Sequence, residues 1–280
     1  MQILNTIHEI KEKLDVERTG GHSIGLVPTM GYFHHGHEAL MQKARAENDI
    51  VVVSIFVNPT QFGQGEDFHN YPSDIERDTA VAQRNKVDYL FTPQDEEIYP
   101  DGFKTFVKVE GLGDFLCGKV RPGHFKGVTT IVAKLFNIIE PEKAYFGLKD
   151  YQQFRIIQKM AQDLHFNINI IGIPTIRDED GLAASSRNAY LNYDEREEAT
   201  ILYEALIKAK ELFEKGISNA SDIITAMTEM IDKRPLVQLE YIHAVNKFNL
   251  ESFDKLKEGQ TLIAIAAKVG KARLIDNIEV

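Results

Sequence analysis

The sequence predicts an α/β protein in which a Rossmann-like, doubly wound parallel sheet is followed by a smaller α+β domain. Apolar, β-branched runs without polar alternation recur in the first part of the chain, which is typical of strands buried on both faces of a sheet. Segments of helical periodicity separate these runs, as parallel strands with helical crossovers require. Near Pro174 the pattern changes to helices followed by strand-like runs, which indicates an α+β arrangement. We therefore expect two domains, residues 1–175 and 176–280.

The elements of the first domain are predicted from periodicity and from flanking turn residues. A helix is expected over residues 1–14, because Ile3, Ile7, Ile10 and Leu14 recur at helical spacing. The strands that follow are expected at residues 24–29, 50–58, 87–91, 106–110, 144–147 and 168–173. The helices between them are expected at residues 37–47, 73–85, 128–139 and 150–164.

The second domain is predicted to hold two helices and three strands. A long, heavily charged helix is expected over residues 194–215, and a second helix over residues 221–233. Three strand-like runs close the chain, at residues 237–245, 261–269 and 273–279. Because no helix separates these last runs, we expect them to form a sheet of their own.

The composition excludes several classes of protein. The net charge of −10, from 32 basic and 42 acidic residues, argues against non-specific nucleic-acid binding, which needs a basic surface. The single cysteine, Cys117, excludes an intrachain disulfide and fits a reducing compartment. No apolar run approaches the roughly 20 residues that a membrane span needs. We therefore expect a cytoplasmic protein without a nucleic-acid or membrane partner.

The turn after the first apolar strand carries the strongest functional signal. The strand breaks at Pro28, and the chain passes through Gly31 and Gly36 before a helical pattern begins at His37. A helix N-terminus that follows a glycine-bearing turn favours an anion, because its N–H groups and its dipole point at the ligand. Two imidazoles, His34 and His37, add further donors. This combination indicates phosphoryl chemistry on a nucleotide.

Two other interpretations of the histidine pair remain open from the sequence. The pair could bind zinc, but it is not H-E-x-x-H, and Cys117 alone cannot supply a thiolate cage. The histidines could also be purely structural, with their ring nitrogens satisfied inside the protein. Glu38 follows His37 directly and suits the positive end of the helix dipole.

Polar residues also follow other predicted strands, at ends that meet along one edge of a doubly wound sheet. Asn58 and Gln61 could bind a carboxylate or hydroxyls without adding charge, although a polar turn around Pro59 is the alternative. Near Gly147, Lys149 opposes the dipole of the helix that follows it, which has a cost unless an anion is present. The spacing of Asp150 and Gln153 also fits a capping box, which needs no ligand.

Hydroxyls and cations follow the last strand of the first domain. Ser185, Ser186 and Arg187 could clamp a phosphate, because arginine binds phosphate through two parallel hydrogen bonds. The alternative is an ordinary surface loop. The basic loop at residues 119–126 could line the rim of the same cleft.

Five sequence clusters together resemble the pantothenate synthetase (pantoate–β-alanine ligase) family, which belongs to the nucleotidyltransferase superfamily shared with class I aminoacyl-tRNA synthetases. They occur in the family's order between residues 27 and 193: Pro28-Thr29-Met30-Gly31 with His34 and Gly36-His37; Asn58-Pro59 with Gln61-Phe62; Arg121-Pro122-Gly123-His124-Phe125; Phe146-Gly147 with Lys149-Asp150 and Gln152-Gln153; and Ser185-Ser186-Arg187-Asn188. The resemblance implies that pantoate, β-alanine and ATP with Mg²⁺ are condensed to pantothenate, AMP and pyrophosphate through a pantoyl adenylate. It also implies a homodimer.

The resemblance also implies a role for each matching residue. His37, as proton donor, and His34, Lys149 and Arg187 would carry catalysis. Pantoate would be bound by Gln61, Gln153, Met30 and Asn58, and β-alanine by Gln61. ATP would be bound by Met30, Gly31, Tyr32, Phe33, His34, His35, Gly36, His37, Gly147, Leu148, Lys149, Asp150, Ile176, Ala184, Ser185, Ser186 and Arg187.

Two positions are less well defined by the resemblance. Ala184 stands where a methionine commonly precedes Ser-Ser-Arg, so the packing on the adenine side would be looser. Asp78 is the candidate magnesium ligand, with a solvated carboxylate or an interface residue as alternatives.

Two other functions remain open, namely an adenylyltransferase that acts on a phosphorylated acceptor and a nucleotide-binding regulatory module. Neutral Gln61 and Gln153 argue against a phosphorylated acceptor, which would need more cations.

Overall fold

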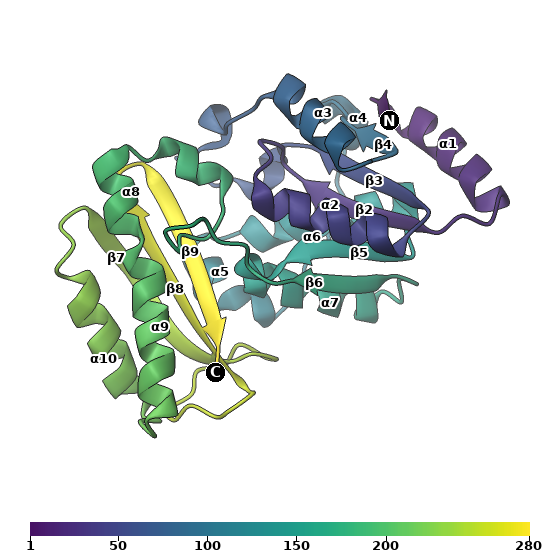
Figure 1. Ribbon diagram of the computed structural model, residues 1–280. Coiled ribbons are helices and arrows are strands. Elements are labelled where there is room, and N and C mark those ends of the chain that lie inside the picture. The colour runs from purple at the N-terminus through teal and green to yellow at the C-terminus, as the bar shows by residue number, and fades with distance from the viewer. The chain divides into compact units, whose positions relative to one another are not determined.

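The computed structural model describes all 280 residues, and their contacts divide the chain into two compact units (Figure 1). The first unit comprises Met1–Gly113, Arg121–Leu148 and Gln153–Pro174. The second unit comprises Asp114–Val120, Lys149–Gln152 and Thr175–Val280. None of the helices is both long enough and apolar enough to cross a membrane.

The first unit is built on a six-stranded parallel sheet, which confirms the predicted fold class. The strand order is β1-β4-β3-β2-β5-β6. The strands are β1 (Gln2–Leu4), β2 (Ile24–Thr29), β3 (Ile50–Ile55), β4 (Tyr89–Phe91), β5 (Lys143–Gly147) and β6 (Asn169–Ile173). Because β2 and β3 are buried along most of their length, they form the uninterrupted apolar runs seen in the sequence.

Helices connect the parallel strands, as right-handed crossovers require. They are α1 (Ile7–Thr19), α2 (His35–Glu47), α3 (Ile75–Arg84), the short α4 (Asp95–Ile98), α6 (His124–Ile139) and α7 (Tyr151–Asp163). The core between sheet and helices includes Phe33 from the turn before α2, Met41 from α2 and Tyr145 from β5.

The chain reverses its direction of travel across the sheet at β2 and β5. From β2 it proceeds through β3 to β4, whereas β5 returns to the other side of β2 and continues to β6. Ligands of doubly wound folds bind beyond the carboxyl ends of the strands at such a switch point. Those ends here are the turn after Thr29 and the chain after Gly147.

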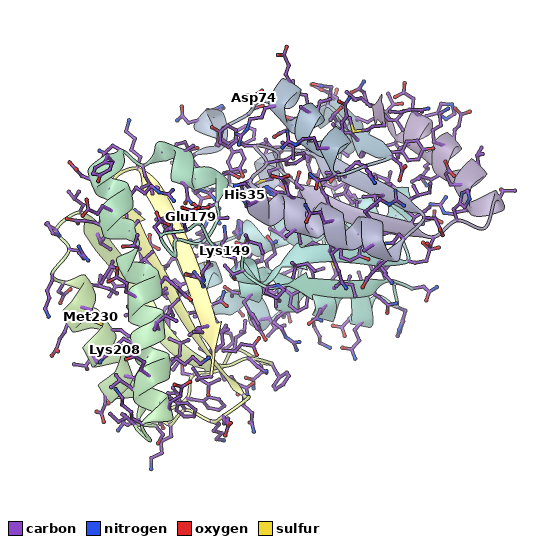
Figure 2. The ribbon with its side chains drawn as sticks, viewed as in Figure 1. His35, Asp74, Lys149, Glu179, Lys208 and Met230 are labelled. Carbon is purple, nitrogen blue, oxygen red and sulfur yellow. The ribbon has the colours of Figure 1, made fainter.

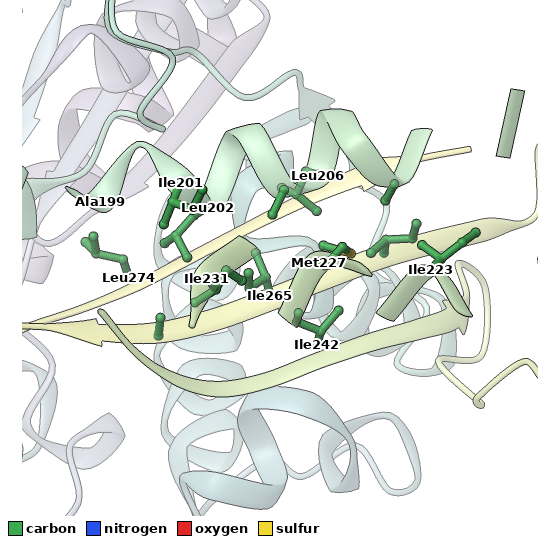
Figure 3. Packing of buried hydrophobic residues seen from close by; sticks show 14 of the residues in the cluster. Ala199, Ile201, Leu202, Leu206, Ile223, Met227, Ile231, Ile242, Ile265 and Leu274 are labelled. Carbon is green, nitrogen blue, oxygen red and sulfur yellow. The ribbon is translucent and has the colours of Figure 1, made fainter. Parts of the chain in front are cut away.

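The second unit contains a three-stranded antiparallel sheet with the order β7-β8-β9. Its strands are β7 (Val237–Asn246), β8 (Thr261–Val269) and β9 (Ala272–Glu279). The helices are α5 (Leu116–Val120), α8 (Tyr193–Ala199), α9 (Ile201–Glu214) and α10 (Ala220–Ile231). Helices α9 and α10 cover one face of the sheet (Figure 1), and their apolar side chains make the core shown in Figure 3.

The prediction of a helix over residues 1–14 is wrong at its start. Residues Gln2–Leu4 form β1, which pairs with β4, and α1 begins only at Ile7. Thr6 caps this helix, and Glu9 returns a bond to the Thr6 backbone in a capping box. The pattern Thr6-x-x-Glu9 was the sequence signal for this later start. Ile3 therefore belongs to a strand and is partly exposed.

Two further element predictions are corrected. Residues 106–110 form no strand, because this extended segment has no sheet partner and is bound to α6 instead. The Thr130 hydroxyl accepts from Val107 N–H, and the Thr129 hydroxyl donates to Val107 C=O. The single helix predicted over residues 194–215 is two helices, α8 and α9, which meet at Thr200. The Thr200 hydroxyl bonds back to Glu197 C=O, a contact that disturbs helices.

Candidate functional site

The turn after β2 is held in a backbone conformation that L-residues rarely adopt. Gly31 has φ +84° and Tyr32 has φ +52°. The Asp78 carboxylate on α3 accepts hydrogen bonds from Tyr32 N–H at 2.6 Å and from Phe33 N–H at 2.7 Å. A positive φ at a tyrosine persists only where its surroundings over-determine it, and the two bonds to Asp78 do so.

Asp78 is 1% exposed, so the interpretation of this residue as a solvated carboxylate is wrong. Burial raises the pKa of its carboxyl above the usual range, against the lowering effect of its backbone hydrogen bonds. Arg77, the preceding residue, donates to Phe33 C=O at 3.1 Å and lies 4.9 Å from the Tyr32 ring centroid. Helix α3 thus fixes the turn through two adjacent side chains.

The two predicted histidines cap the N-terminus of α2. His34 Nδ1 accepts from Gly36 N–H at 3.1 Å, and His37 Nδ1 accepts from His34 N–H at 3.3 Å. This is a capping box in which imidazoles replace the usual hydroxyl and carboxylate. Because each Nδ1 accepts, each neutral ring carries its proton on Nε2, which is a donor. The ring centroids lie 4.1 Å apart, so the two imidazoles are neighbours at the helix start.

A structural role for these histidines is therefore compatible with a ligand-binding role. In each ring Nδ1 caps the helix, whereas Nε2 is the nitrogen that carries the proton. His35 differs from its neighbours. It begins α2 with an exposed ring 3.4 Å from the Glu38 carboxylate (Figure 2).

Gln61 lies in the short 3-10 helix η1 (Pro59–Gln61) that follows β3, and its carboxamide is held from two sides. Its Nε2 lies 3.0 Å from Met30 Sδ, and its Oε1 accepts from Asn58 Nδ2 at 3.0 Å. Asn58 is fully buried, donates also to Gly127 C=O, and accepts from Tyr99 Oη at 2.8 Å. Both polar atoms of the Asn58 amide thus form hydrogen bonds within the protein, and one of these bonds orients Gln61.

The basic loop near residue 121 supports the same glutamine through its main chain. His124 Nδ1 lies 2.8 Å from Gln61 C=O, and its Nε2 lies 3.1 Å from Arg121 Nη1. Arg121 also forms two hydrogen bonds to Glu66, at 2.7 and 2.6 Å. Burial raises the pKa of the Glu66 carboxyl, but the hydrogen bonds and charge of Arg121 lower it more, so this pKa lies below its usual range. Sequence reasoning placed this loop at the rim and missed its contact with Gln61.

Helix α6 approaches η1 so closely that only glycine fits at position 127. A Cβ at Gly127 would lie 2.4 Å from Thr60 C=O and 2.6 Å from Gln61 Cα. Gly147, at the end of β5, differs because no heavy atom lies within 4 Å of the position a Cβ would take. Leu148 follows it in a 3-10 turn, η4 (Leu148–Asp150), and Gln153 lies half-buried in the first turn of α7.

The remaining candidates belong to the second unit and are held by their own contacts. Lys149 Nζ, labelled in Figure 2, lies 3.4 Å from Ala184 C=O and 4.0 Å from the Asp150 carboxylate. Ala184 N–H donates to Ile176 C=O at 2.9 Å, and Arg177 pairs with Ala183 in an isolated antiparallel bridge. Residues 176–184 therefore form a hairpin whose two ends both carry predicted ATP-binding residues.

Ser185 begins a 3-10 helix, η5 (Ser186–Tyr190), that carries the predicted clamp. Its hydroxyl accepts from Arg187 N–H at 3.3 Å, and Ser186 is buried. Asn188 Nδ2 donates to Ala183 C=O at 3.1 Å. The segment from Ser185 to Asn188 is thus held by local hydrogen bonds and is not an unstructured surface loop.

A metal site with three or more protein side chains is not formed. No group of three or more histidine, cysteine, aspartate or glutamate side chains is arranged to hold a metal ion. At Asp78 both carboxylate oxygens accept backbone hydrogen bonds. That geometry favours a role in holding the turn.

The fold and the first unit's site together define an α/β protein of the Rossmann-like class, in which the N-terminus of α2 lies at the switch point of the sheet. Comparison with known proteins then identifies the family. The sequence profile of pantoate–beta-alanine ligase matches residues 2–279. The chain belongs to this family and is an enzyme of the pantoate–β-alanine ligase type, which confirms the resemblance found in the sequence.

Curated relatives and solved structures are similar to this chain over almost its whole length. Pantothenate synthetase from Acetivibrio thermocellus is 50% identical over 278 residues, which cover 99% of each chain. That from Fervidobacterium nodosum is 51% identical over 278 residues, with the same coverage. A crystal structure of pantothenate synthetase from Thermus thermophilus has a TM-score of 0.95 at 45% identity, covering 100% of this chain and 99% of its own.

A second solved structure, pantoate–beta-alanine ligase from Francisella tularensis, is described as a complex with beta-gamma ATP and beta-alanine. It has a TM-score of 0.82 at 36% identity and covers 100% of this chain and 97% of its own.

Proposed function

We propose that this enzyme uses ATP to join pantoate to β-alanine through a pantoyl-adenylate intermediate, with release of pantothenate, AMP and pyrophosphate. The observation that carries the proposal is the imidazole cap of α2, which places two histidine rings at a helix N-terminus beside the switch point. The Francisella tularensis relative, described with a beta-gamma ATP and beta-alanine, supports the same substrates.

We propose that ATP binds along two sets of residues, one from each unit. From the first unit these are Met30 through His37, Gly147 and Leu148. From the second they are Lys149, Asp150, Ile176 and Ala184 through Arg187. The open space beside Gly147 supports close approach of a ligand to the backbone.

Adenylation needs a pantoate carboxylate that is not paired with a cation, and it needs stabilisation of the negative charge on the α-phosphate. A pantoate carboxylate oxygen attacks the α-phosphorus, and the bond from that phosphorus to pyrophosphate breaks. Negative charge then grows on the phosphate oxygens, so catalysis is largely positioning plus fixed positive potential. His34 and His37 supply that potential through Nε2–H, with His37 as proton donor, and Lys149 and Arg187 supply it as cations.

Pantoate would be bound by Gln61, Gln153, Met30 and Asn58, and β-alanine by Gln61. Neutral amides suit the nucleophile, because a salt bridge would lower the reactivity of its carboxylate. The fixed carboxamide of Gln61 supports this role, and Asn58 Nδ2 donates to it. In the second half-reaction the β-alanine amine attacks the acyl carbon, the bond to AMP breaks, and the amine loses a proton.

Mg²⁺ would accompany ATP, because this ion commonly keeps several waters and binds substrate phosphates with only one or two carboxylates. It would neutralise charge on the phosphates. Asp78 stays a predicted ligand only, since both of its carboxylate oxygens hold the turn.

We also propose that residues 1–175 bind ATP and pantoate and that residues 176–280 act as a lid. An acyl adenylate hydrolyses in water, so exclusion of water would protect it. As the resemblance implies, the enzyme would act as a homodimer, which sedimentation equilibrium would test.

Exchange of labelled pyrophosphate into ATP tests the proposed reaction. Because adenylation is the first half-reaction, exchange should require pantoate and should proceed without β-alanine. Exchange that requires a phosphorylated acceptor instead would identify an adenylyltransferase. A complete absence of exchange, with ATP still bound, would contradict the pantoyl-adenylate intermediate.

A further inference from the structure

The C-terminal strand β9 carries two adjacent polar side chains that the reaction proposed above does not use. Asp276 is 4% exposed, and Asn277 is half-buried. Both contact segments that are far away in the sequence. Asp276 lies 99 positions from Arg177, and Asn277 lies 128 positions from Lys149.

Asp276 anchors the hairpin at residues 176–184. Arg177 donates to its carboxylate twice, from Nη1 at 2.5 Å and from Nη2 at 2.9 Å. The same guanidinium lies 3.8 Å from the Tyr203 ring centroid on α9 and donates to Gly181 C=O at 3.2 Å. A planar guanidinium held by a carboxylate, a ring and a carbonyl has little freedom to move.

The turn of this hairpin is packed against the same helix. Gly181 has φ +88°, and a Cβ there would lie 2.6 Å from Tyr203 Cδ1. Arg177 directly follows Ile176, whose carbonyl accepts from Ala184 N–H. The contact with Asp276 therefore sets the position of both ends of the hairpin, including Ile176 and the start of the Ser185–Arg187 segment.

Asn277 holds the other proposed ATP-binding element of this unit. Its Nδ2 donates to Lys149 C=O at 2.8 Å. Successive side chains of a strand point to opposite faces, so Asp276 and Asn277 reach their two partners from opposite sides of β9. One strand thus holds both Lys149 and the hairpin, in addition to the direct contact of Lys149 Nζ with Ala184 C=O.

We propose that Asp276 and Asn277 are positioning residues for the ATP end of the reaction. They fix Lys149 and residues 176–187 relative to each other before any substrate binds. This inference rests on the function proposed above, because it takes these two segments as the ATP-binding part of the second unit.

Hydrogen–deuterium exchange of the full chain without substrate tests the anchoring itself. Asn277→Asp has the same shape but cannot donate to Lys149 C=O, so amides at residues 149–152 should exchange faster. Asp276→Asn should weaken the contact with Arg177, so the amides of residues 176–184 should exchange faster. Glu279→Gln, also on β9 but paired with Lys247 at the surface, is the matched control and should change neither segment. Unchanged exchange in Asn277→Asp would overturn the proposal, even if Asp276→Asn failed to fold.

Kinetics test whether this anchoring serves catalysis. Small misplacements of catalytic groups can cost about a hundredfold in rate, so Asn277→Asp should lower kcat/KM for ATP by about tenfold or more. The KM for β-alanine should stay as in Glu279→Gln. An equal loss for all three substrates together with a lowered Tm would show a merely structural role and overturn the proposal. If the wild-type chain lacks pantoate-dependent exchange, the proposed function fails separately, while the substrate-free measurement still decides the anchoring.

Discussion

The histidines of the α2 turn show how one residue type can serve fold and chemistry together. Nδ1 of each ring accepts a backbone N–H at the helix start, which fixes the ring and leaves the proton on Nε2. A serine or glutamate could cap the helix equally well but could not present an N–H donor beyond it. The choice of imidazole at both positions therefore favours a bound anion.

Replacing His37 by alanine should slow the reaction far more than it weakens ATP binding. Loss of one preorganised donor typically costs about 10²–10³ in rate. The measurement is single-turnover adenylation alongside ATP binding by calorimetry. Equal losses in both would make His37 a binding residue only. His35→Ala, at the exposed neighbouring position, is the control.

Asp78→Asn should destabilise the protein and impair the turn. Asparagine has the size of aspartate, but its amide group would face one of two backbone N–H donors, and a buried unsatisfied group costs about 1–3 kcal/mol. Chemical denaturation and the exchange assay measure the two effects. Asp74→Asn is the control, since it makes the same change at the cap of α3 without reaching the turn. Equal behaviour of the two variants would contradict the role assigned to Asp78.

At the scale of elements, helix termini and strand ends are tied together by a few charged contacts. Glu47, in the last turn of α2, accepts from Tyr145 Oη at 2.9 Å and from Lys143 Nζ at 3.4 Å, both on β5. It also pairs with Lys43 on its own helix. These contacts connect α2 to the strand that borders the switch point.

The contribution of Glu47 to stability should depend on pH. Hydrogen bonds from Lys43 and Tyr145 lower the pKa of its carboxyl from 4.5 to about 2. A lowered pKa in the folded state stabilises at pH values above the unfolded value, and this effect is lost as pH falls through the folded value. The difference in Tm between wild type and Glu47→Gln should therefore be full near pH 7 and shrink between about pH 4.5 and 2. Glu12→Gln, at an exposed site of α1, controls for the lost charge. A difference that is constant with pH would contradict this account.

At the scale of the whole molecule, each compact unit has its own core and its own share of the proposed ATP-binding residues. The first core includes Phe33 and Met41, and the second lies between β7–β9 and helices α9 and α10 (Figure 3). Each set of site residues is held by contacts inside its unit, as Asp78 holds the turn and Asp276 holds the hairpin.

Stabilisation by ATP should therefore be sensitive to substitutions in both units. A ligand at a hundred times its Kd stabilises the folded state by about 2.7 kcal/mol. His34→Ala in the first unit and Arg187→Ala in the second should each reduce the ATP-induced rise in Tm. Lys210→Ala removes an exposed cation from α9 and should leave the rise intact. If Arg187→Ala left it intact as well, ATP would not engage the second unit.

The sequence by itself determined the fold class, the family and the turn that carries the histidines. Buried parallel strands leave continuous apolar runs, and glycines mark the turns between strand and helix, so local composition reports both. The late start of α1 was also readable, since Thr6 and Glu9 form a local capping pattern. These features depend on residues close together in the chain.

Only the tertiary structure decided how the site residues are held. Asp78 contacts a turn 45 positions away, and Asp276 contacts Arg177 across 99 positions. Asn58, a predicted pantoate ligand, also supports Gln61, because its Nδ2 donates to Gln61 Oε1 while its Oδ1 accepts from Tyr99 Oη. No local pattern encodes such contacts, since a single carboxylate or amide gives the same sequence signal in a solvated loop as it does when it is buried beneath a turn.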